Sequence, residues 1–390
     1  MFSSKLSEAM RCGMILGVCI DKPALKYTCA AIFAHFRGRP GFMIPQLIAC
    51  ILTIQDAPAD RVLANSDCIR SNMIEQALEQ LYVEEYDSAL VTCQRLQHVV
   101  PDDPIASLLQ LNIYQAQMRA YRVRIFESKL DSLITQAIEQ ADRKAKNTQS
   151  AEMLFMQGSP RSILALHSFR QGEWAKAITA LTHSLHYMKK SLMKDHSFVD
   201  PKLSLGFYKY YQYKMLNLGL GLRKSAYNEA TSLILEVWEK GRYLSTDAGF
   251  ALQNMYLHES DYSKALEVND WLTERTPNHP SILYHRALLM QSLQRPQVAL
   301  DCWLALIGRL QSYRMQSHGY LAECYLHVTQ IYESMNAIVH RQEINQAIAL
   351  ARQHSALRNP ELELESSFQK PDDIDKEIQK LCKKYCSADQ

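Results

Sequence analysis

The sequence predicts an all-α protein, built as a superhelical solenoid of antiparallel helix pairs. Glycine and proline number only 13 each in 390 residues, roughly half of the combined share of about 12% in an average protein. Similar segments also recur along the chain, and Ala299 lies 34 residues after its counterpart Ala265. With 47% hydrophobic residues, the chain can bury a large core. A repeat of this period indicates two-helix units stacked in a row.

Charge and cysteine content argue against a nucleic-acid-binding protein and against a disulfide-stabilised protein. The 43 basic and 41 acidic side chains leave a formal net charge of +2, without the basic excess that a duplex-binding surface needs. The ten cysteines are scattered, and none lies between Cys93 and Cys302, which does not fit a disulfide framework. We therefore expect no nucleic-acid partner, and a central region held together by packing alone.

Residues 1–60 form an N-terminal segment with two open interpretations. An apolar run over 42–54 is followed by Ala57-Pro-Ala59, which together suit an export signal and its cleavage site. The four residues ending at Cys50 also match the site at which bacterial lipoproteins are cut and lipidated. The other interpretation is an extra pair of packed helices. Export to the periplasm or cell envelope is slightly favoured over a cytoplasmic location, and a membrane contact is expected only if Cys50 carries a lipid anchor.

Residues 61–355 form the predicted repeat domain. Only three of its seven units have the standard length, and 104–151 and 152–201 are expected to be elongated helix pairs. The last unit has a break near Asn336. The predicted units are 70–103, 104–151, 152–201, 202–245, 246–279, 280–313 and 314–355.

Small residues recur at fixed places in these units. Each second helix opens with a segment such as Asp261-Tyr-Ser-Lys-Ala-Leu266, and the first helices carry patterns such as Leu321-Ala-x-x-Tyr325. A small residue lets two helices approach closely, and Pro277 ends a second helix because it cannot continue one. These motifs resemble the tetratricopeptide repeat (TPR) family. That resemblance implies a binding scaffold for proteins or peptides, with neither an enzymatic activity nor a cofactor.

A more particular resemblance lies between residues 152 and 310. Its motifs are Arg170-Gln-Gly-Glu-Trp174, the aromatic segment 203–211 and the segment Ala251-Leu-Gln-Asn-Met-Tyr-Leu-His258. They are similar to those of a group of bacterial, often exported, TPR proteins of unsettled function. An alternative role is therefore that of a cell-envelope assembly factor or lipoprotein-type accessory factor.

The resemblance also implies which residues bind a partner. In TPR proteins the concave groove is lined by first-helix residues outside the packing motif, and the chain places mixed apolar and amide side chains there. Phe250 stands where chaperone-binding relatives have a lysine, so a chaperone-tail receptor is not expected. Such a surface suits a helix or an extended peptide. The implied groove residues are Phe250, Asn254, Leu257, His258, Tyr284, Leu288 and Gln291.

The run Phe207–Tyr213 is the densest aromatic cluster in the sequence. On a helix, Tyr210 and Tyr211 share a face with Phe207. They either pack between neighbouring repeats or form an aromatic wall in the groove.

Motifs for catalysis are lacking. Gly219 and Gly221 lack the third glycine and the Lys-Ser/Thr of a phosphate loop. The rival prediction is a metal-dependent module around His183 and His186, which lie three residues apart, with His196 further on. Because no third ligand stands at a fixed offset, we expect no metal site.

Residues 356–390 form a tail with a capping helix. Ile374, Ile378, Leu381 and Tyr385 fall on one helical face. Asp372 or Asp373 is expected to cap that helix. Because the end of a solenoid needs a cover with a polar outer side, this helix is the predicted end cap.

Overall fold

A computed structural model describes residues 59–215, 222–365 and 368–385. The chain divides into two compact units, residues 1–66 and 67–390, and the fold described below is that of the second. The apolar run 42–54, Cys50 and the glycines of the loop 217–221 lie outside the described residues. The export and lipid-anchor predictions therefore stay predictions.

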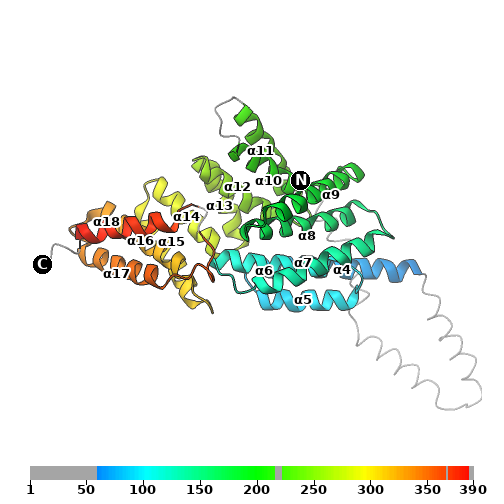
Figure 1. Cartoon of the computed structure of the whole chain (residues 1–390), viewed down its shortest axis with the longest axis horizontal. Coiled ribbons are helices and arrows are strands. Elements are labelled where there is room, and N and C mark those ends of the chain that lie inside the picture. Colours follow the sequence, from blue (N-terminus) through cyan, green and yellow to red (C-terminus); the bar gives the residue numbers. More distant parts are fainter. Residues whose placement is uncertain (1–58, 216–221, 366–367, 386–390) are drawn as a thin grey trace, which may run out of the picture. The chain divides into compact units, whose positions relative to one another are not determined.

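The described residues are helical, and they follow one another as helix pairs (Figure 1). Their one extended pairing is an isolated antiparallel bridge between Val123 and Glu363. The predicted all-α solenoid of helix pairs is confirmed. The pairs are α4 (Ala59–Tyr82) with α5 (Tyr86–Val99), α6 (Ile105–Tyr121) with α7 (Glu127–Ala145), α8 (Ala151–Arg170) with α9 (Trp174–Lys194), α10 (Pro201–Met215) with α11 (Leu222–Lys240), α12 (Ser245–His258) with α13 (Tyr262–Arg275), α14 (Pro280–Ser292) with α15 (Pro296–Ser312), and α16 (His318–Asn336) with α17 (Arg341–Leu357), followed by α18 (Pro371–Tyr385).

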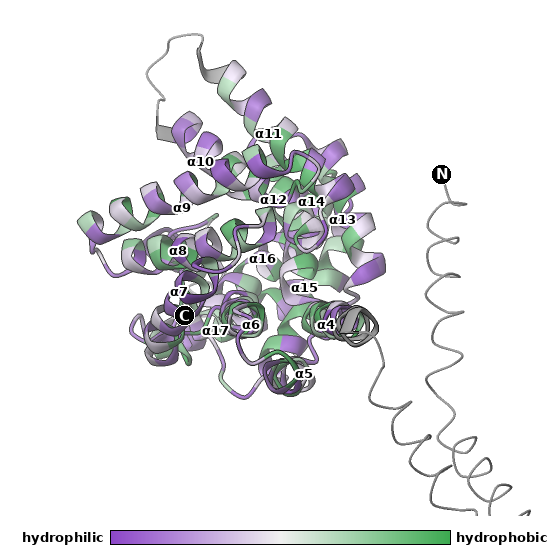
Figure 2. Ribbon diagram, turned by 90° about the vertical axis from the view of Figure 1, so that its right-hand side faces the viewer, coloured by the Kyte–Doolittle hydropathy of each residue, from purple (hydrophilic) through white to green (hydrophobic). Residues whose placement is uncertain are grey.

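Small residues stand where helices approach most closely. Ala265 and Ala299, the motif alanines of α13 and α15, are fully buried. A Cβ atom on Gly206 of α10 would come within 2.5 Å of Ile234 Cγ1 on α11, which leaves no room for any other residue at this position. Polar residues cover the outer side of the pairs, as the purple turns of α13 show in Figure 2.

The helix ends explain the unequal lengths of the repeats. α6 ends at Tyr121 because Arg122 adopts a left-handed conformation, with φ of 51°, and α7 begins at Glu127. The segment 104–151 is therefore an elongated pair, as the sequence predicts. α16 ends at Asn336, the predicted break.

The tail helix α18 packs on α16 and α17. Its predicted face is confirmed, since Ile374, Ile378, Leu381 and Tyr385 are all buried. The predicted cap is wrong in position, because the helix begins at Pro371 and both aspartates lie in its first turn. Carboxylates in a first turn still interact favourably with the helix dipole.

The repeats do not contact only their neighbours. α6 of the second pair also contacts α14 of the sixth pair. First helices far apart in sequence therefore meet on the inner side of the repeats. None of the described helices is both long and apolar enough to cross a membrane.

Candidate functional site

The seven residues that the resemblance places in the groove lie on two consecutive first helices. Phe250, Asn254, Leu257 and His258 belong to α12, and Tyr284, Leu288 and Gln291 belong to α14. His258 is exposed, whereas Leu257 and Tyr284 are buried, and the other four are half-buried. The structure therefore brings these residues together, with different degrees of access to solvent.

Contacts with other parts of the chain hold this surface in place. The Phe250 ring lies 5.2 Å from the ring of His279. The side-chain oxygen of Gln291 accepts a hydrogen bond of 3.0 Å from the indole N–H of Trp303. The Tyr284 hydroxyl donates to the carboxylate of Glu323 over 2.6 Å. The result is a fixed surface of rings and amides.

One aromatic side chain from the tail lies on this surface. Phe368 stacks on His258, with ring centroids 4.4 Å apart and an interplanar angle of 9°. Its centroid is also 5.7 Å from the rings of both Tyr284 and His285. Part of the predicted groove is thus already in contact with the protein's own tail.

The segment Asn359–Glu365 brings the tail to this place through a turn at residues 360–362 and an isolated bridge at Glu363. Its backbone pairs with the connection between α6 and α7, where Leu364 N–H donates to Arg122 O over 2.9 Å and Arg124 N–H donates to Leu362 O over 2.8 Å. The Arg124 side chain adds a third bond, from Nε to Glu363 O over 3.0 Å. The backbone of Leu362–Leu364 is therefore held by the kind of hydrogen bonds that hold an added strand.

The carboxylate of Glu363 is the anchor of that segment. Its side chain is buried, at 5% exposure, and it accepts hydrogen bonds from Ser317 Oγ, Gly319 N and Asn359 N at 3.0, 2.6 and 3.0 Å. Two of these donors belong to the N-terminal end of α16, where the helix dipole favours a negative charge. The absence of a side chain at Gly319 allows this approach, because a Cβ there would lie 3.0 Å from the Glu363 carboxylate.

Arg122 occupies the centre of this region. Its guanidinium forms a buried ion pair with Glu323 at 2.5 Å and lies over the rings of Tyr320 and Tyr284, at 3.6 and 4.6 Å from their centroids. Burial alone would lower the pKa of Arg122, but Glu323 and the two tyrosines raise it above its usual value. The arginine therefore stays charged and connects α6 to α14 and α16.

Sequence reasoning misses Arg122, Glu323 and Glu363. The residues that come together here are separated by about 200 positions in the chain, so no local motif announces them. The sequence offers one signal for this cluster. Glu323 falls on the face of α16 that is expected to be buried, among mainly apolar residues.

The two tyrosines predicted on α10 have different surroundings. Tyr210 is buried against Tyr213 and Tyr227, at centroid distances of 5.9 and 6.4 Å. Tyr211 is 58% exposed. Only Tyr211 is open to a partner.

Sequence reasoning misses an exposed apolar surface formed by Phe169, Trp174 and Ile178. On the ends of α8 and α9, Phe169 and Trp174 pack edge to face with centroids 4.8 Å apart, yet Trp174 and Ile178 remain 60% and 63% exposed. The motif Arg170–Trp174 does not by itself indicate that its tryptophan is exposed. Large exposed apolar side chains gathered in one place are a feature of interaction surfaces.

The histidines of the rival metal hypothesis are not gathered into a metal site. His183, His186 and His196 are exposed. Within residues 59–215, 222–365 and 368–385, no group of three or more His, Cys, Asp or Glu side chains is placed to hold a metal ion.

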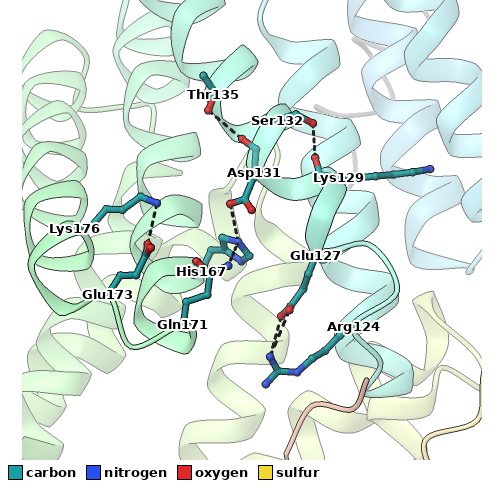
Figure 3. A network of polar contacts seen from close by, with 10 residues as sticks. All are labelled: Arg124, Glu127, Lys129, Asp131, Ser132, Thr135, His167, Gln171, Glu173 and Lys176. Carbon is teal, nitrogen blue, oxygen red and sulfur yellow. Dashed lines mark hydrogen bonds and ion pairs between the residues drawn. The ribbon is translucent and has the colours of Figure 1, made fainter. Parts of the chain in front are cut away.

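One buried histidine is paired with a carboxylate in a way that invites a catalytic interpretation. His167 Nε2 lies 3.0 Å from Asp131 Oδ1 and 3.0 Å from Gln171 Nε2, between α7 and α8 (Figure 3). Its other ring nitrogen is buried without a partner among the described residues. Because neither nitrogen contacts a hydroxyl or thiol, the pair lacks the nucleophile that such catalysis requires.

A shallow hollow of about 520 Å³ lies between α7, α8 and α9, with Asp142, Tyr187 and Lys190 among its lining residues. None of the predicted partner-binding residues lines it. The groove surface and the hollow are therefore separate features.

Comparisons with known proteins find likeness in structure only. No family model matches the chain, and no curated protein matches it. The Cut9–Hcn1 structure of the APC/C is 12% identical with a TM-score of 0.41, and the alignment covers 77% of this chain and 47% of that one. The present chain thus spans about half the length of that relative.

Two further structures have similar scores. The C-terminal part of a TPR repeat-containing protein from Cytophaga hutchinsonii is 14% identical, with a TM-score of 0.35 and coverage of 77% of this chain and 98% of that one. A Rap protein in complex with competence and sporulation factor is 12% identical, with a TM-score of 0.41 and coverage of 75% and 79%. At these identities the likeness concerns the helical fold alone.

Proposed function

We propose that this protein is a non-enzymatic scaffold that binds a protein partner through an extended segment laid on the first helices α12 and α14. The observation that carries the proposal is the stacking of Phe368 on His258 and beside Tyr284. An aromatic side chain from a distant part of the chain is held by two of the residues that the resemblance places in the groove. The surface therefore has the shape and chemistry to hold an aromatic anchor, the residue type that dominates many interfaces.

The exposed apolar surface at Trp174 also supports a scaffold. Trp and Tyr are enriched at the centres of protein interfaces, and Trp174 and Tyr211 are both more than half exposed. The alternative of a cell-envelope accessory factor is the same scaffold at another location. It depends on residues 42–59 and stays a prediction.

Site-specific photocrosslinking tests the proposal. A photoreactive phenylalanine analogue at Leu288, on α14, is expected to capture a partner, whereas the same analogue at the exposed Lys264 of α13 is the matched control. The captured protein is then identified and purified, and its affinity is measured by titration. Leu288→Asp should weaken binding at least tenfold, with Lys264→Asp unchanged. Equal affinity of both variants would contradict a site on α14.

A further inference from the structure

The tail segment is the part of the molecule whose contacts most resemble those of a bound ligand. The segment Asn359–Glu365 turns at residues 360–362, and its backbone from Leu362 to Leu364 then pairs with residues 122–124 through bonds of 2.8 and 2.9 Å. Peptides that add a strand to a protein gain affinity from such backbone bonds and specificity from a few inserted side chains. The segment therefore presents the two parts of a peptide ligand, a paired backbone and selected anchors.

Two side chains supply the anchors. Glu363 is buried and places its carboxylate on Ser317 and Gly319 at the start of α16. Five residues later, Phe368 stacks on His258. Between and beside these anchors, Glu361, Leu362 and Glu365 are exposed. Leu364, between the anchors, is half-buried against the hydrophobic core. The carboxylate of Glu363 and the ring of Phe368 are thus the two side-chain anchors, with Leu364 beside them.

The receiving surface is built for these two groups. Gly319 leaves room for the carboxylate, since a Cβ at this position would meet Glu363 at 3.0 Å. The ring site consists of His258, Tyr284 and His285 from two consecutive first helices. An aromatic ring and a carboxylate from another chain would find the same partners once the segment is displaced.

The way the segment is attached makes displacement feasible. It connects α17, which ends at Leu357, to α18, which begins at Pro371, and both helices have buried faces of their own. Release of the segment therefore does not require either helix to unfold. A tethered segment acts as a competitor at a high effective concentration.

We infer that residues 359–365 together with Phe368 are a resident peptide of the predicted groove, and that its external ligand is a peptide segment with an acidic residue followed five positions later by an aromatic one. This inference rests on the proposed function and adds the chemistry of the partner and its regulation. A partner of this kind gains access by displacing the resident segment. The measured affinity for the partner is then lowered in proportion to the fraction of molecules from which the resident segment is released.

Binding of a peptide in trans tests the inference. The probe is a fluorescein-labelled peptide with the sequence of residues 358–370, titrated with the full chain. Glu363→Ala/Phe368→Ala in the protein should bind it at least tenfold more tightly than the original protein does, because the resident competitor is weakened. The matched control is Glu361→Ala/Leu362→Ala, which changes two exposed side chains of the same segment and should leave the affinity unchanged.

Changes in the peptide and on α16 complete the test. A peptide carrying both alanines at its Glu and Phe positions should not bind. Gly319→Ala, combined with Glu363→Ala/Phe368→Ala in the protein (the weakened protein), should abolish binding of the unsubstituted peptide. If the double variant loses its helical circular dichroism, Phe368→Ala alone is used, with a smaller gain expected. Equal binding by the original and the weakened protein, or binding of the doubly substituted peptide, would overturn the inference.

The partner captured from Leu288 separates this inference from the proposed function. If the partner binds the original protein and the Glu363→Ala/Phe368→Ala variant equally tightly, the proposed scaffold function is supported and the resident-peptide inference is contradicted. If the partner binds only the variant, both the proposed function and the inference are supported.

Discussion

At the scale of single residues, buried polar side chains decide how the helix pairs join. Asp200, before α10, is fully buried and accepts hydrogen bonds from the backbone N–H groups of Arg242, Tyr243 and Leu244 at 2.9, 2.7 and 2.8 Å. One carboxylate thus satisfies three donors in the connection between α11 and α12. It fixes the angle at which one pair follows the next.

Replacing this carboxylate should destabilise the protein strongly. Asp200→Ala leaves buried N–H groups without partners and is expected to lower the free energy of unfolding by about 2 to 4 kcal/mol. Urea denaturation followed by circular dichroism measures the change. Asp195→Ala, at an exposed position between α9 and α10, where Asp200 also lies, should have little effect. Similar losses in both variants would contradict the role given to Asp200.

His327 provides a pH-dependent contribution to stability. Its ring stacks on Trp303 at 4.4 Å, and both nitrogens are buried without a hydrogen-bond partner among the described residues. Burial lowers its pKa to about 4, although Glu323 acts in the opposite direction. Between an unfolded pKa of about 6.5 and about 4, the unfolded state binds a proton that the folded state does not. Stability therefore falls as the pH drops through this window.

His327→Phe should reduce that dependence. The ring stack is retained and the titrating group is removed, so the loss of stability from pH 6.5 to pH 5 should shrink, by at most about 1.4 kcal/mol per pH unit. Urea titrations at several pH values test this, with the exposed His186→Ala as control. Part of the pH dependence of stability remains in the His327→Phe variant, because burial also lowers the pKa values of His279 and His285 to about 3. An unchanged slope would show that His327 does not titrate in this window.

At the scale of helices, α18 covers the end of the last pair with one apolar face. Ile378→Asp places a charge on this buried face and should cost about 2 to 4 kcal/mol. Gln379→Asp is the matched control on the exposed side of the same helix and should change stability little. Thermal unfolding of both variants compares the two faces.

The sequence predicts the helix pairs well because their signals are local. The motif residues of one repeat, such as Ala265 and Ala299, pack against helices close to them in the chain. A small residue or a break such as Asn336 can be recognised within about 40 residues. Regular spacing then provides the order of the pairs.

The candidate site is less predictable because its contacts are distant in sequence. The resemblance selects His258 and Tyr284, which the structure brings together, but it does not indicate that Phe368 lies on them. Nor does any pattern indicate that Arg122 would leave the helical conformation. These features arise from the way the repeats meet across the inner side, which depends on all the intervening helices.

At the scale of the whole repeat domain, the ion pair between Arg122 and Glu323 joins the early repeats to the late ones. Arg122→Met leaves a buried carboxylate without its partner and should lower stability by about 3 to 5 kcal/mol. Arg122→Met/Glu323→Met removes both charges and should recover part of this loss. A double-mutant cycle, measured by urea denaturation, isolates the coupling. Additive losses would indicate that the pair does not interact.

A second contact of the same kind accompanies it. Arg309, near the end of α15, pairs with Glu84 of the connection between α4 and α5. It also donates to the Tyr121 hydroxyl over 3.2 Å. The early and late repeats are therefore connected at more than one place.

The ion pair between Arg122 and Glu323 of α16 has a consequence for how the protein folds. In a solenoid with neighbour contacts only, each repeat can fold as soon as the next is complete. Arg122, however, must wait for a partner 201 residues further along the chain. At a synthesis rate of 5 to 20 residues per second, this interval is about 10 to 40 s. During that time the inner side of the early repeats stays uncovered on the ribosome, open to chaperones and to aggregation.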